Sequence, residues 1–465
     1  MAPAGRVAFD PDYLQSVLTR HAEASRYVVA YSGGVDSHVL LHLLQQLAQS
    51  CASFASVAAL HINHGIHAHA ADWATHCTRV ADGLGIAFKC VQVDGVHRPG
   101  QSPEEAARIA RYTAFSDYLL PGDVLLLAQH QDDQTETVLL QLMRGAGVTG
   151  LAGMAPESDL GRGQLLRPLL AVTRDEIVAY AQQQGLEWID DPSNQDRAVD
   201  RNFLRHDVIP LLKSRWPALD RVVGRSARHS AVASGLNQDL AELDYHDVRA
   251  TGSDTLGTDR LLGLELARRC NLIRFWLSRV HQVRVPDTQI LDRVCREVIP
   301  CQHDRTPLVQ WGEGEIRRFQ GHLFFMHRQP RLESGVSLDW DLNTVIDLPA
   351  GLGRLSAQHG CGGGHRIRSH ASTHVRVAFR VGGEKLKPVG FDCTRSLKNL
   401  FQEHHIPPWW RDRIPLLFVD SKLAAVGDFW IDQRLLVNRN EPGWQIHWKH
   451  GNTLENRYFL PSPIR

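Results

Sequence analysis

The chain has 465 residues, of which 43% are hydrophobic and 22% are charged, a composition typical of globular proteins. It excludes collagen-like and intrinsically disordered chains, and the length suffices for several domains. No apolar run approaches the ~18 residues that a membrane span needs, and no signal-peptide pattern stands at the start. We therefore expect no association with a membrane.

Charge is unevenly distributed, although 51 basic and 51 acidic residues cancel over the whole chain. Residues 1–215 carry 17 basic and 24 acidic side chains, a net charge of −7, whereas residues 361–465 carry 16 and 9, a net charge of +7. An acidic front and a basic tail favour one domain that handles metal-complexed phosphate and another that touches a polyanion.

The eight cysteines form no CxxC pair and no spacing typical of zinc ligands. Unpaired cysteines without a secretory signal are typical of proteins in a reducing compartment. We therefore expect reduced thiols and a cytoplasmic location.

Short apolar runs alternate with helical patterns over the first 215 residues, which predicts an α/β fold with a parallel sheet covered on both faces. After the first strand from Arg26, further strands are expected at 57–62, 86–93, 124–128 and 165–170. Helices are expected at 70–84, 103–120 and 131–144, and Ser102 and Thr173 each begin a capping-box pattern.

The alternation stops near Trp216, which suggests four segments along the chain. We expect a catalytic α/β domain at 1–216, a mainly helical middle domain at 217–330 with short β-like runs after Cys301, and a linker or loop region at 331–370 that is rich in Gly and His. A small α+β domain is expected at 371–465.

The segment from Ser32 to Ser37 reads SGGVDS and lies where the first strand meets a helix. Paired glycines let backbone amides approach a ligand closely, and the helix N-terminus adds a positive dipole end. The turn can therefore hold a pyrophosphate. It is neither a GxxxxGK[ST] loop nor a GxGxxG turn.

A second polar segment, QHQDDQTE, runs from Gln129 to Glu136 at the end of a predicted strand and the start of a helix. Ligands of parallel sheets bind at the carboxyl ends of the strands, so this segment should face the SGGVDS turn. Its acids suit Mg²⁺ or a substrate ammonium, or they complement the helix dipole alone. We take Asp132, Asp133, Glu136 and His130 as candidate catalytic residues.

The segment from His61 to His69 is rich in histidine, with His61, Asn63, His64, His67 and His69 after a predicted strand. Because no cysteine lies beside them, we favour a loop next to the nucleotide over a zinc site. His61 and Asn63 are the expected nucleotide contacts.

Two pairs of arginines are candidates for binding phosphate. Arg108 and Arg111 lie on a predicted helix, where they could also be exposed surface charges. Arg201 and Arg205, four residues apart, can clamp a phosphate on one helix face or pair with Asp196, Asp200 and Asp207.

The strand–SGGVDS–helix arrangement resembles the PP-loop ATP pyrophosphatases, which cleave ATP between the α and β phosphates and adenylate a substrate. The resemblance implies ATP and Mg²⁺ as cofactors, with Asp36 near the metal. We take Asp133 as the second candidate metal ligand, although the sequence does not decide between Asp132 and Asp133. It implies that the pyrophosphate end of ATP contacts Ser32, Gly33, Gly34, Val35, Asp36 and Ser37.

Further strings narrow the resemblance to the tRNA(Ile)-lysidine synthase family. They are HINHG, EEAARIARY, AQHQDDQTET, LMRGAG, RPLL, WIDDPSN and DRNFLR over residues 26–215, then RVGGEKLKP and the run from SLKNLFQEHH to GDFWI in the tail. Residues 217–370 match least well. The likeness implies ATP-dependent attachment of free L-lysine to the wobble cytidine of the CAU-anticodon tRNA(Ile), through an adenylated tRNA with release of pyrophosphate and AMP. A homodimer is one expected assembly, although the sequence does not decide the oligomeric state.

The tail combines basic and aromatic residues, as in proteins that bind RNA. Trp409 and Trp410 can stack on bases, although Pro407 and Pro408 also suit a buried corner for at least one of them. The candidate tRNA contacts there are Lys385, Lys387, Arg395 and Lys398, with Arg411 and Arg413 beside the tryptophans.

Two alternatives stay open at this point. A PP-loop tRNA sulfurtransferase that thiolates cytidine or uridine would share the scaffold, but the cluster-dependent and persulfide types need placed cysteines, commonly CxxC. A nucleotide-binding RNA adaptor without catalysis would not require so many carboxylates beside the phosphate-binding turn.

Overall fold

The structure is a computed structural model. It describes residues 9–51, 54–65, 69–93, 103–302, 305–312, 314–333, 335–361, 365–368, 375–438 and 440–451, so Ser102 and His67 lie outside the described residues. The chain divides into two compact units, Met1–Asn237 and Gln238–Arg465.

The first unit is built on a six-stranded sheet of the described residues in the order β3-β2-β1-β4-β6-β5. The strands are β1 (Arg26–Ala30), β2 (Ser56–Asn63), β3 (Ala87–Gln92), β4 (Asp123–Leu126), β5 (Glu157–Leu160) and β6 (Gly163–Leu166). Five of them run parallel, and β5 pairs antiparallel with β6. The predicted α/β fold class is confirmed. Among the described strands of this sheet, β5 was not expected, and the strand expected at 165–170 is β6, which ends four residues earlier.

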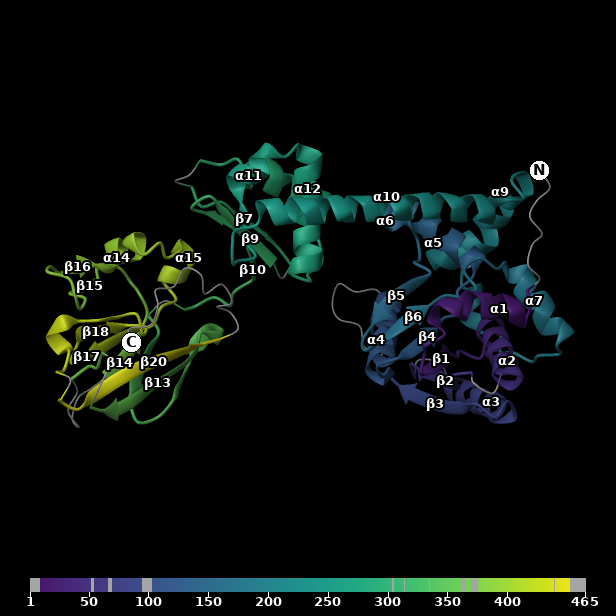
Figure 1. Cartoon of the computed structure of the whole chain (residues 1–465), viewed down its shortest axis with the longest axis horizontal. Helices are drawn as coiled ribbons and strands as arrows, with labels where there is room; N and C mark the ends of the chain where they lie inside the picture. Colours follow the sequence, from purple (N-terminus) through teal and green to yellow (C-terminus); the bar gives the residue numbers. More distant parts are fainter. Residues whose placement is uncertain are drawn as a thin grey trace. The chain divides into compact units, whose positions relative to one another are not determined.

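Helices pack on both faces of this sheet (Figure 1). Val29 and Leu126 face a core with α2, whereas Val28 and Leu125 face a core with α4, because neighbouring strand residues point to opposite faces. The helices are α1 (Pro11–Leu18), α2 (Val35–Ser50), α3 (Ala70–Gly83), α4 (Pro103–Tyr118), α5 (Gln131–Met143), α6 (Val148–Leu151), α7 (Arg174–Gln183), α8 (Asp200–Phe203) and α9 (Ile209–Arg215).

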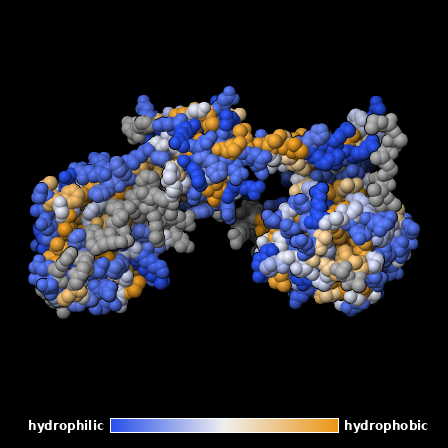
Figure 2. Space-filling model, in the orientation of Figure 1, coloured by the Kyte–Doolittle hydropathy of each residue, from blue (hydrophilic) through white to orange (hydrophobic). Residues whose placement is uncertain are grey.

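Helix α10 (Leu219–Val248) is 30 residues long and continues from the first unit into the second. Figure 2 shows apolar side chains along it, and Val232, Leu236 and Leu243 are each more than 60% exposed. Among the described residues, no helix combines the length and the apolar character that crossing a bilayer requires.

The second unit begins with helices around an antiparallel sheet in the order β7-β10-β9-β8. The strands are β7 (Leu256–Gly257), β8 (Leu308–Trp311), β9 (Gly314–Phe319) and β10 (His322–His327). The helices are α11 (Thr258–Gly263), α12 (Leu266–Phe275) and α13 (Thr288–Arg293), the last two extended by π-helical turns at Trp276–Val280 and Val294–Val298. Trp276 and Leu323 lie in their common core.

The end of the chain forms a five-stranded sheet, in the order β11-β14-β17-β18-β19, and two smaller sheets. The strands of these three sheets are β11 (Ser337–Trp340), β12 (Ile346–Leu348), β13 (Gly353–Gly360), β14 (Val375–Ala378), β15 (Lys385–Leu386), β16 (Arg395–Ser396), β17 (Leu416–Val419), β18 (Lys422–Val426), β19 (Trp430–Ile431) and β20 (Gly443–His450). The helices are α14 (Leu397–Glu403) and α15 (Pro408–Arg411).

The segment 331–370 differs from the linker that the sequence suggested, because β11, β12 and β13 lie in it. Their partners are distant in sequence: β11 pairs with β14, and β13 pairs with β20 over eight residue pairs. The division of the chain at residues 216, 330 and 370 stays a prediction, and the first compact unit extends to Asn237.

Candidate active site

A cavity of about 680 Å³ lies at the carboxyl ends of β1, β2 and β4. The chain runs from β1 to β2 and β3 on one side and returns to β4 on the other, so this is the switch point where α/β sheets bind ligands. The expected site residues that line it are Ser32, Gly34, Val35, Asp36, Ser37, His61, Asn63, Arg108, Arg111, His130, Asp133, Arg201 and Arg205.

The SGGVDS turn is held by its own hydroxyl groups. Ser32 Oγ lies 3.0 Å from Ser37 Oγ, which donates to the Gly34 carbonyl at 3.1 Å. Gly33 has a φ of +86°, and a side chain there would meet Cys77 Sγ and Ile189 at 3.0 Å. The turn therefore needs glycine at position 33. It leads directly into the N-terminus of α2, where backbone amides and the helix dipole favour an anion.

Asp36, His130 and Asp133 meet at the floor of the cavity. His130 Nε2 lies 3.7 Å from Asp36 Oδ1 and 3.4 Å from Asp133 Oδ2, so both carboxylates face one ring nitrogen. Asp36 Oδ1 is buried and accepts no hydrogen bond from the described residues. Burial raises the pKa of Asp36, while the nearby His130 lowers it. A cation at this point would relieve the cost of burying the carboxylate.

The donors at this point fit Mg²⁺, which binds through one or two carboxylates and keeps its remaining positions for water and substrate phosphate. Asp36 Oδ1 is available for it, whereas Asp133 already accepts three hydrogen bonds, from His130, Arg201 and Arg205. Within the described part of the chain no group of three His, Cys, Asp or Glu residues is arranged to hold a metal by itself. The site thus fits a metal shared with phosphate.

Arg201 and Arg205 both pair with acids of α5. Their Nε atoms lie 2.6 Å from the two carboxylate oxygens of Glu136, and their Nη2 atoms lie 3.1 and 3.2 Å from Asp133 Oδ1. Burial opposes the charge of Arg205, but Glu136 and Asp133 outweigh it and its pKa is raised. The ion-pair partners proposed from the sequence were wrong for both arginines.

Of the expected site residues in the first unit, three do not line the cavity: Gly33, Asp132 and Glu136. Glu136 is 1% exposed and is enclosed by the two arginines. Asp132 accepts from Lys213 Nζ at 2.7 Å and from the backbone amide of Arg174 at 2.9 Å. In this structure Asp132 holds the Lys213 side chain in place, and Glu136 holds the two arginine side chains.

Lys213 and Asp220 were not identified from the sequence. Lys213 Nζ bridges Asp132 and Asp220 at 2.7 and 2.6 Å, and Thr135 Oγ1 donates to Asp220 at 2.8 Å. The first turn of α10 is thereby tied to the start of α5, which carries Asp133. No local pattern signals this connection, because the partners are about 80 residues apart.

The histidine-rich segment contributes to the cavity wall without forming a metal site in the described residues. His61 Nδ1 lies 2.9 Å from the Tyr31 carbonyl, and burial lowers the pKa of His61. His64 also lines the cavity, and burial likewise lowers its pKa. His69 precedes α3 and lies beside Asp72 instead.

The two arginines of α4 differ in their surroundings. Arg108 lies 3.7 Å from Glu105 and over the ring of Tyr112. Arg111 forms no ion pair among the described residues, and burial lowers its pKa. A guanidinium that lines the cavity without an anionic partner is suited to a substrate phosphate.

Further lining residues that the sequence did not single out are Trp73, Glu104 and Arg174. Asp190 and Asp191, from the WIDDPSN string, also line the cavity. Arg174 is the first residue of α7, whose predicted capping box between Thr173 and Glu176 is confirmed. Its position beside the N-cap indicated a helix start, and only the fold shows that this start faces the cavity.

The comparisons with known proteins agree along the chain. A PP-loop domain matches residues 11–212, a TilS substrate binding domain matches 256–324, and a TilS substrate C-terminal domain matches 375–448. A tRNA(Ile)-lysidine synthase of Methylococcus capsulatus is 42% identical over 431 residues, which are 91% of this chain and 96% of that protein. The chain belongs to the tRNA(Ile)-lysidine synthase family.

A second member of the tRNA(Ile)-lysidine synthase family, from Coxiella burnetii, is 38% identical over 94% of this chain and 96% of that protein. Among solved structures, the U34-tRNA thiolase NcsA of Methanococcus maripaludis is similar with a TM-score of 0.40 and 17% identity, covering 47% of this chain and 76% of that one. That likeness is too low to bear on function.

The tail residues expected to bind tRNA in a lysidine synthase differ in whether their charged groups already have a partner. Lys385, Lys387 and Lys398 form no side-chain ion pair among the described residues, whereas Arg395 pairs with Glu403 and lies over the Phe391 ring. Trp410 is buried in the core of the second unit, as the corner interpretation anticipated for one tryptophan. The three lysines are therefore the better candidates for phosphate.

Proposed function

We propose that this protein joins L-lysine to the wobble cytidine of the CAU-anticodon tRNA(Ile) by an ATP-dependent reaction. The observation that carries the proposal is the SGGVDS turn beside the buried Oδ1 atom of Asp36, at the switch point of the sheet of a lysidine synthase family member. The pyrimidine 2-carbonyl oxygen attacks the α-phosphate, pyrophosphate leaves, and the ε-amine of lysine then displaces AMP.

In this proposal the chain works mainly by binding and positioning. Ser32, Gly34 and Ser37 hold the leaving pyrophosphate through backbone amides and hydroxyls, and Gly33 sets the shape of the turn. His61 and Asn63 are the proposed contacts of the nucleoside part of ATP. Arg108 and Arg111 are the proposed contacts for phosphates of ATP or RNA.

The five candidate catalytic residues fall into two groups, according to whether they face the cavity or contact neighbouring cationic side chains. They are Asp36, Asp132, Asp133, His130 and Glu136. We propose Asp36 as the main Mg²⁺ ligand with Asp133 beside it, and His130 as the residue that fixes their spacing. When bound, Mg²⁺ supplies neutralising charge to the phosphates. Asp132 and Glu136 act as positioning residues, because they contact Lys213, Arg201 and Arg205 instead of the cavity.

Lysine has a proposed place at the acidic wall of the cavity. Glu104 and Asp190 line it and form no ion pair among the described residues. A lysine ammonium requires such carboxylates, because a charge that leaves water needs a partner.

The sulfurtransferase alternative has less support. No cysteine is among the described residues that line the cavity, and the nearby Cys77 is buried, which raises its thiol pKa to about 12. Such a thiol does not form the thiolate that sulfur transfer needs.

A cytoplasmic location is also a proposal, supported by eight free cysteines. A homodimer stays a prediction.

The reaction can be tested with the purified protein, Mg·ATP, a tRNA(Ile) transcript and each labelled amino acid in turn. Stable label on the RNA from lysine alone is the expected result. A transcript in which uridine replaces the wobble cytidine should stay unlabelled. Transfer of sulfur, or label from several amino acids, would contradict the proposal.

The basic tail is expected to supply much of the salt-dependent affinity for tRNA. Replacing Lys385, Lys387 and Lys398 by Gln should raise the KM for tRNA and make the log–log slope of affinity against salt shallower by roughly 0.7 to 0.9 for each of these lysines that faces a phosphate. The KM values for ATP and lysine should change little. Filter binding over a salt series measures the slope, and parallel lines with equal affinity would show that these lysines are only solvated surface.

A further inference from the structure

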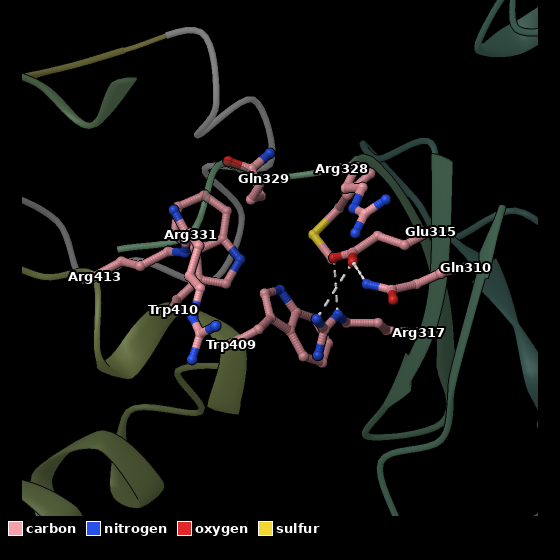
Figure 3. A pocket seen from close by; sticks show the side chains of 10 residues that line it. Gln310, Glu315, Arg317, Arg328, Gln329, Arg331, Trp409, Trp410 and Arg413 are labelled. Atoms are coloured by element: carbon pink, nitrogen blue, oxygen red, sulfur yellow. Dashed lines mark hydrogen bonds and ion pairs between the residues drawn. The ribbon is translucent and has the colours of Figure 1, made fainter. Parts of the chain in front are cut away.

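A second pocket, of about 260 Å³, lies wholly within the second unit. Strands β8 to β10 and the segment 328–331 form one side of it, and helix α15 with Arg413 forms the other. Figure 3 shows side chains from both parts turned toward a common space. The residues that line it are Gln310, Glu315, Arg317, Met326, Arg328, Gln329, Arg331, Trp409, Trp410 and Arg413.

The pocket is strongly basic, with four arginines against one glutamate. That glutamate is already engaged: Glu315 Oε1 accepts from Arg317 Nε at 2.9 Å, and Glu315 Oε2 accepts from Gln310 at 2.8 Å (Figure 3). Arg328 and Arg331 form no ion pair among the described residues. The pocket therefore has positive charge left for an anion.

Arg413 is the most constrained of these cations. Its Nη2 donates to the Pro330 carbonyl at 2.6 Å, and its Nη1 is buried without a hydrogen-bond partner among the described residues. Burial lowers the pKa of Arg413. A guanidinium that is fixed on one side and unsatisfied on the other is suited to a phosphate or carboxylate oxygen.

Flat side chains from the strands and from α15 meet at Trp409. The Arg317 guanidinium lies over the Trp409 ring at 5.3 Å, and Phe319 and Phe324 contact the same ring edge-on. Trp409 Nε1 is buried and has no hydrogen-bond partner in the described structure. Stacked guanidinium and indole planes, with an unused N–H donor, are suited to a planar base that has acceptor atoms on its edge.

We propose that this pocket binds one unpaired nucleotide of the RNA substrate, with its phosphate on Arg328, Arg331 and Arg413 and its base against the Trp409 and Arg317 planes. The volume suits a single nucleotide and excludes a double helix, whose bases are stacked inside. The proposal rests on the proposed function, because it takes RNA as the substrate. It adds a contact for single-stranded RNA apart from the lysines of the tail.

Binding of short RNAs to the full-length protein tests this assignment. The probes are a fluorescent single-stranded RNA of about eight nucleotides, a duplex of the same length, and free CMP as a competitor. The Arg328→Gln/Arg331→Gln variant should bind the single strand about tenfold more weakly than the wild type does. The matched control, Arg293→Gln/Arg296→Gln, removes two exposed charges from the same unit and should change binding less than about twofold.

Photocrosslinking reports on the base. A thiouridine-containing single strand should crosslink to the segment 409–413 in the wild type and much less in the Arg328→Gln/Arg331→Gln variant. The single strand should bind more tightly than the duplex does, and CMP in large excess should displace it. Equal affinity of this variant and the control, crosslinks confined to other segments, or a duplex that binds as tightly as the single strand would overturn the pocket assignment. Lysine incorporation by the wild type is measured separately, so its presence with a failed pocket test would leave the proposed function standing.

Discussion

Replacing Asp36 with asparagine is expected to lower the rate of pyrophosphate release about a thousandfold, since loss of metal charge neutralisation costs several kcal/mol in the transition state. Asp36 Oδ1 is the buried oxygen at the cavity floor that accepts no hydrogen bond from the described residues. An amide of the same shape keeps the packing but loses the charge. The affinity for tRNA should stay nearly intact, because the tail lysines lie in the other unit.

The measurement is pyrophosphate release under saturating tRNA and a series of Mg·ATP concentrations. Asp133→Asn should also lose most of its rate. Asp72→Asn, which removes an exposed acid from the same unit, is the matched control and should keep the wild-type rate. Near-wild-type turnover of Asp36→Asn with saturating Mg·ATP would show that the metal site is assigned to the wrong residue.

Replacing Arg201 and Arg205 together with methionine is expected to lower the free energy of unfolding by about 3 kcal/mol, because it leaves the buried Glu136 carboxylate without its partners. Glu136 is 1% exposed, while the arginine side chains are 30% and 23% exposed, so the carboxylate bears most of the cost. Urea unfolding monitored by circular dichroism measures the change.

Two further variants separate charge from packing. Adding Glu136→Leu to the double variant should recover much of the lost stability, since the more deeply buried of the two unpaired carboxylates is then removed and only the partly exposed Asp133 remains. Arg197→Met breaks a surface pair with Asp207 and should cost less than about 1 kcal/mol. Unfolding of the double variant at the wild-type urea concentration would show that the ion pairs of Glu136 do not stabilise the fold.

The sheet of the first unit was predictable because its central strands are apolar runs set between helical patterns. The predicted strands at 57–62 and 86–93 correspond to β2 and β3 within two residues. Strand β5 was not predictable in the same way. Its sequence, ESDL, is polar and mostly exposed at the sheet edge, and only pairing with β6 makes it a strand.

The site was predictable where its chemistry is local in sequence. The SGGVDS turn and the segment after β4 each signal a phosphate or metal site, and the rule for parallel strands brings them together. The ion pairs of Arg201 and Arg205 were not predictable, because Glu136 and Asp133 lie 65 to 72 residues away in the chain. Nearer acids were equally plausible until the fold was known.

The Gly-rich segment 351–370 shows how a distant partner changes an interpretation. Glycine and histidine there suggested a loop, yet β13 pairs with β20 about 90 residues later. Gly353, at a φ of +93°, lies so close to the backbone of Lys449 and His450 that a side chain could not fit. The glycine that suggested a flexible loop instead permits this strand contact.

The bond from Asp220 to Lys213 and Thr135 has a consequence for exchanging parts between related enzymes. A hybrid joined near Trp216 would take the first turn of α10 from one parent and the start of α5 from the other. The contact between α10 and α5 in the hybrid would form only if both parents have the acid, the lysine and the threonine that stand at positions 220, 213 and 135 in this chain. A junction beyond Asn237 takes all of these partners from one parent, so the second unit can be replaced while the floor of the cavity in the first unit stays that of a single parent.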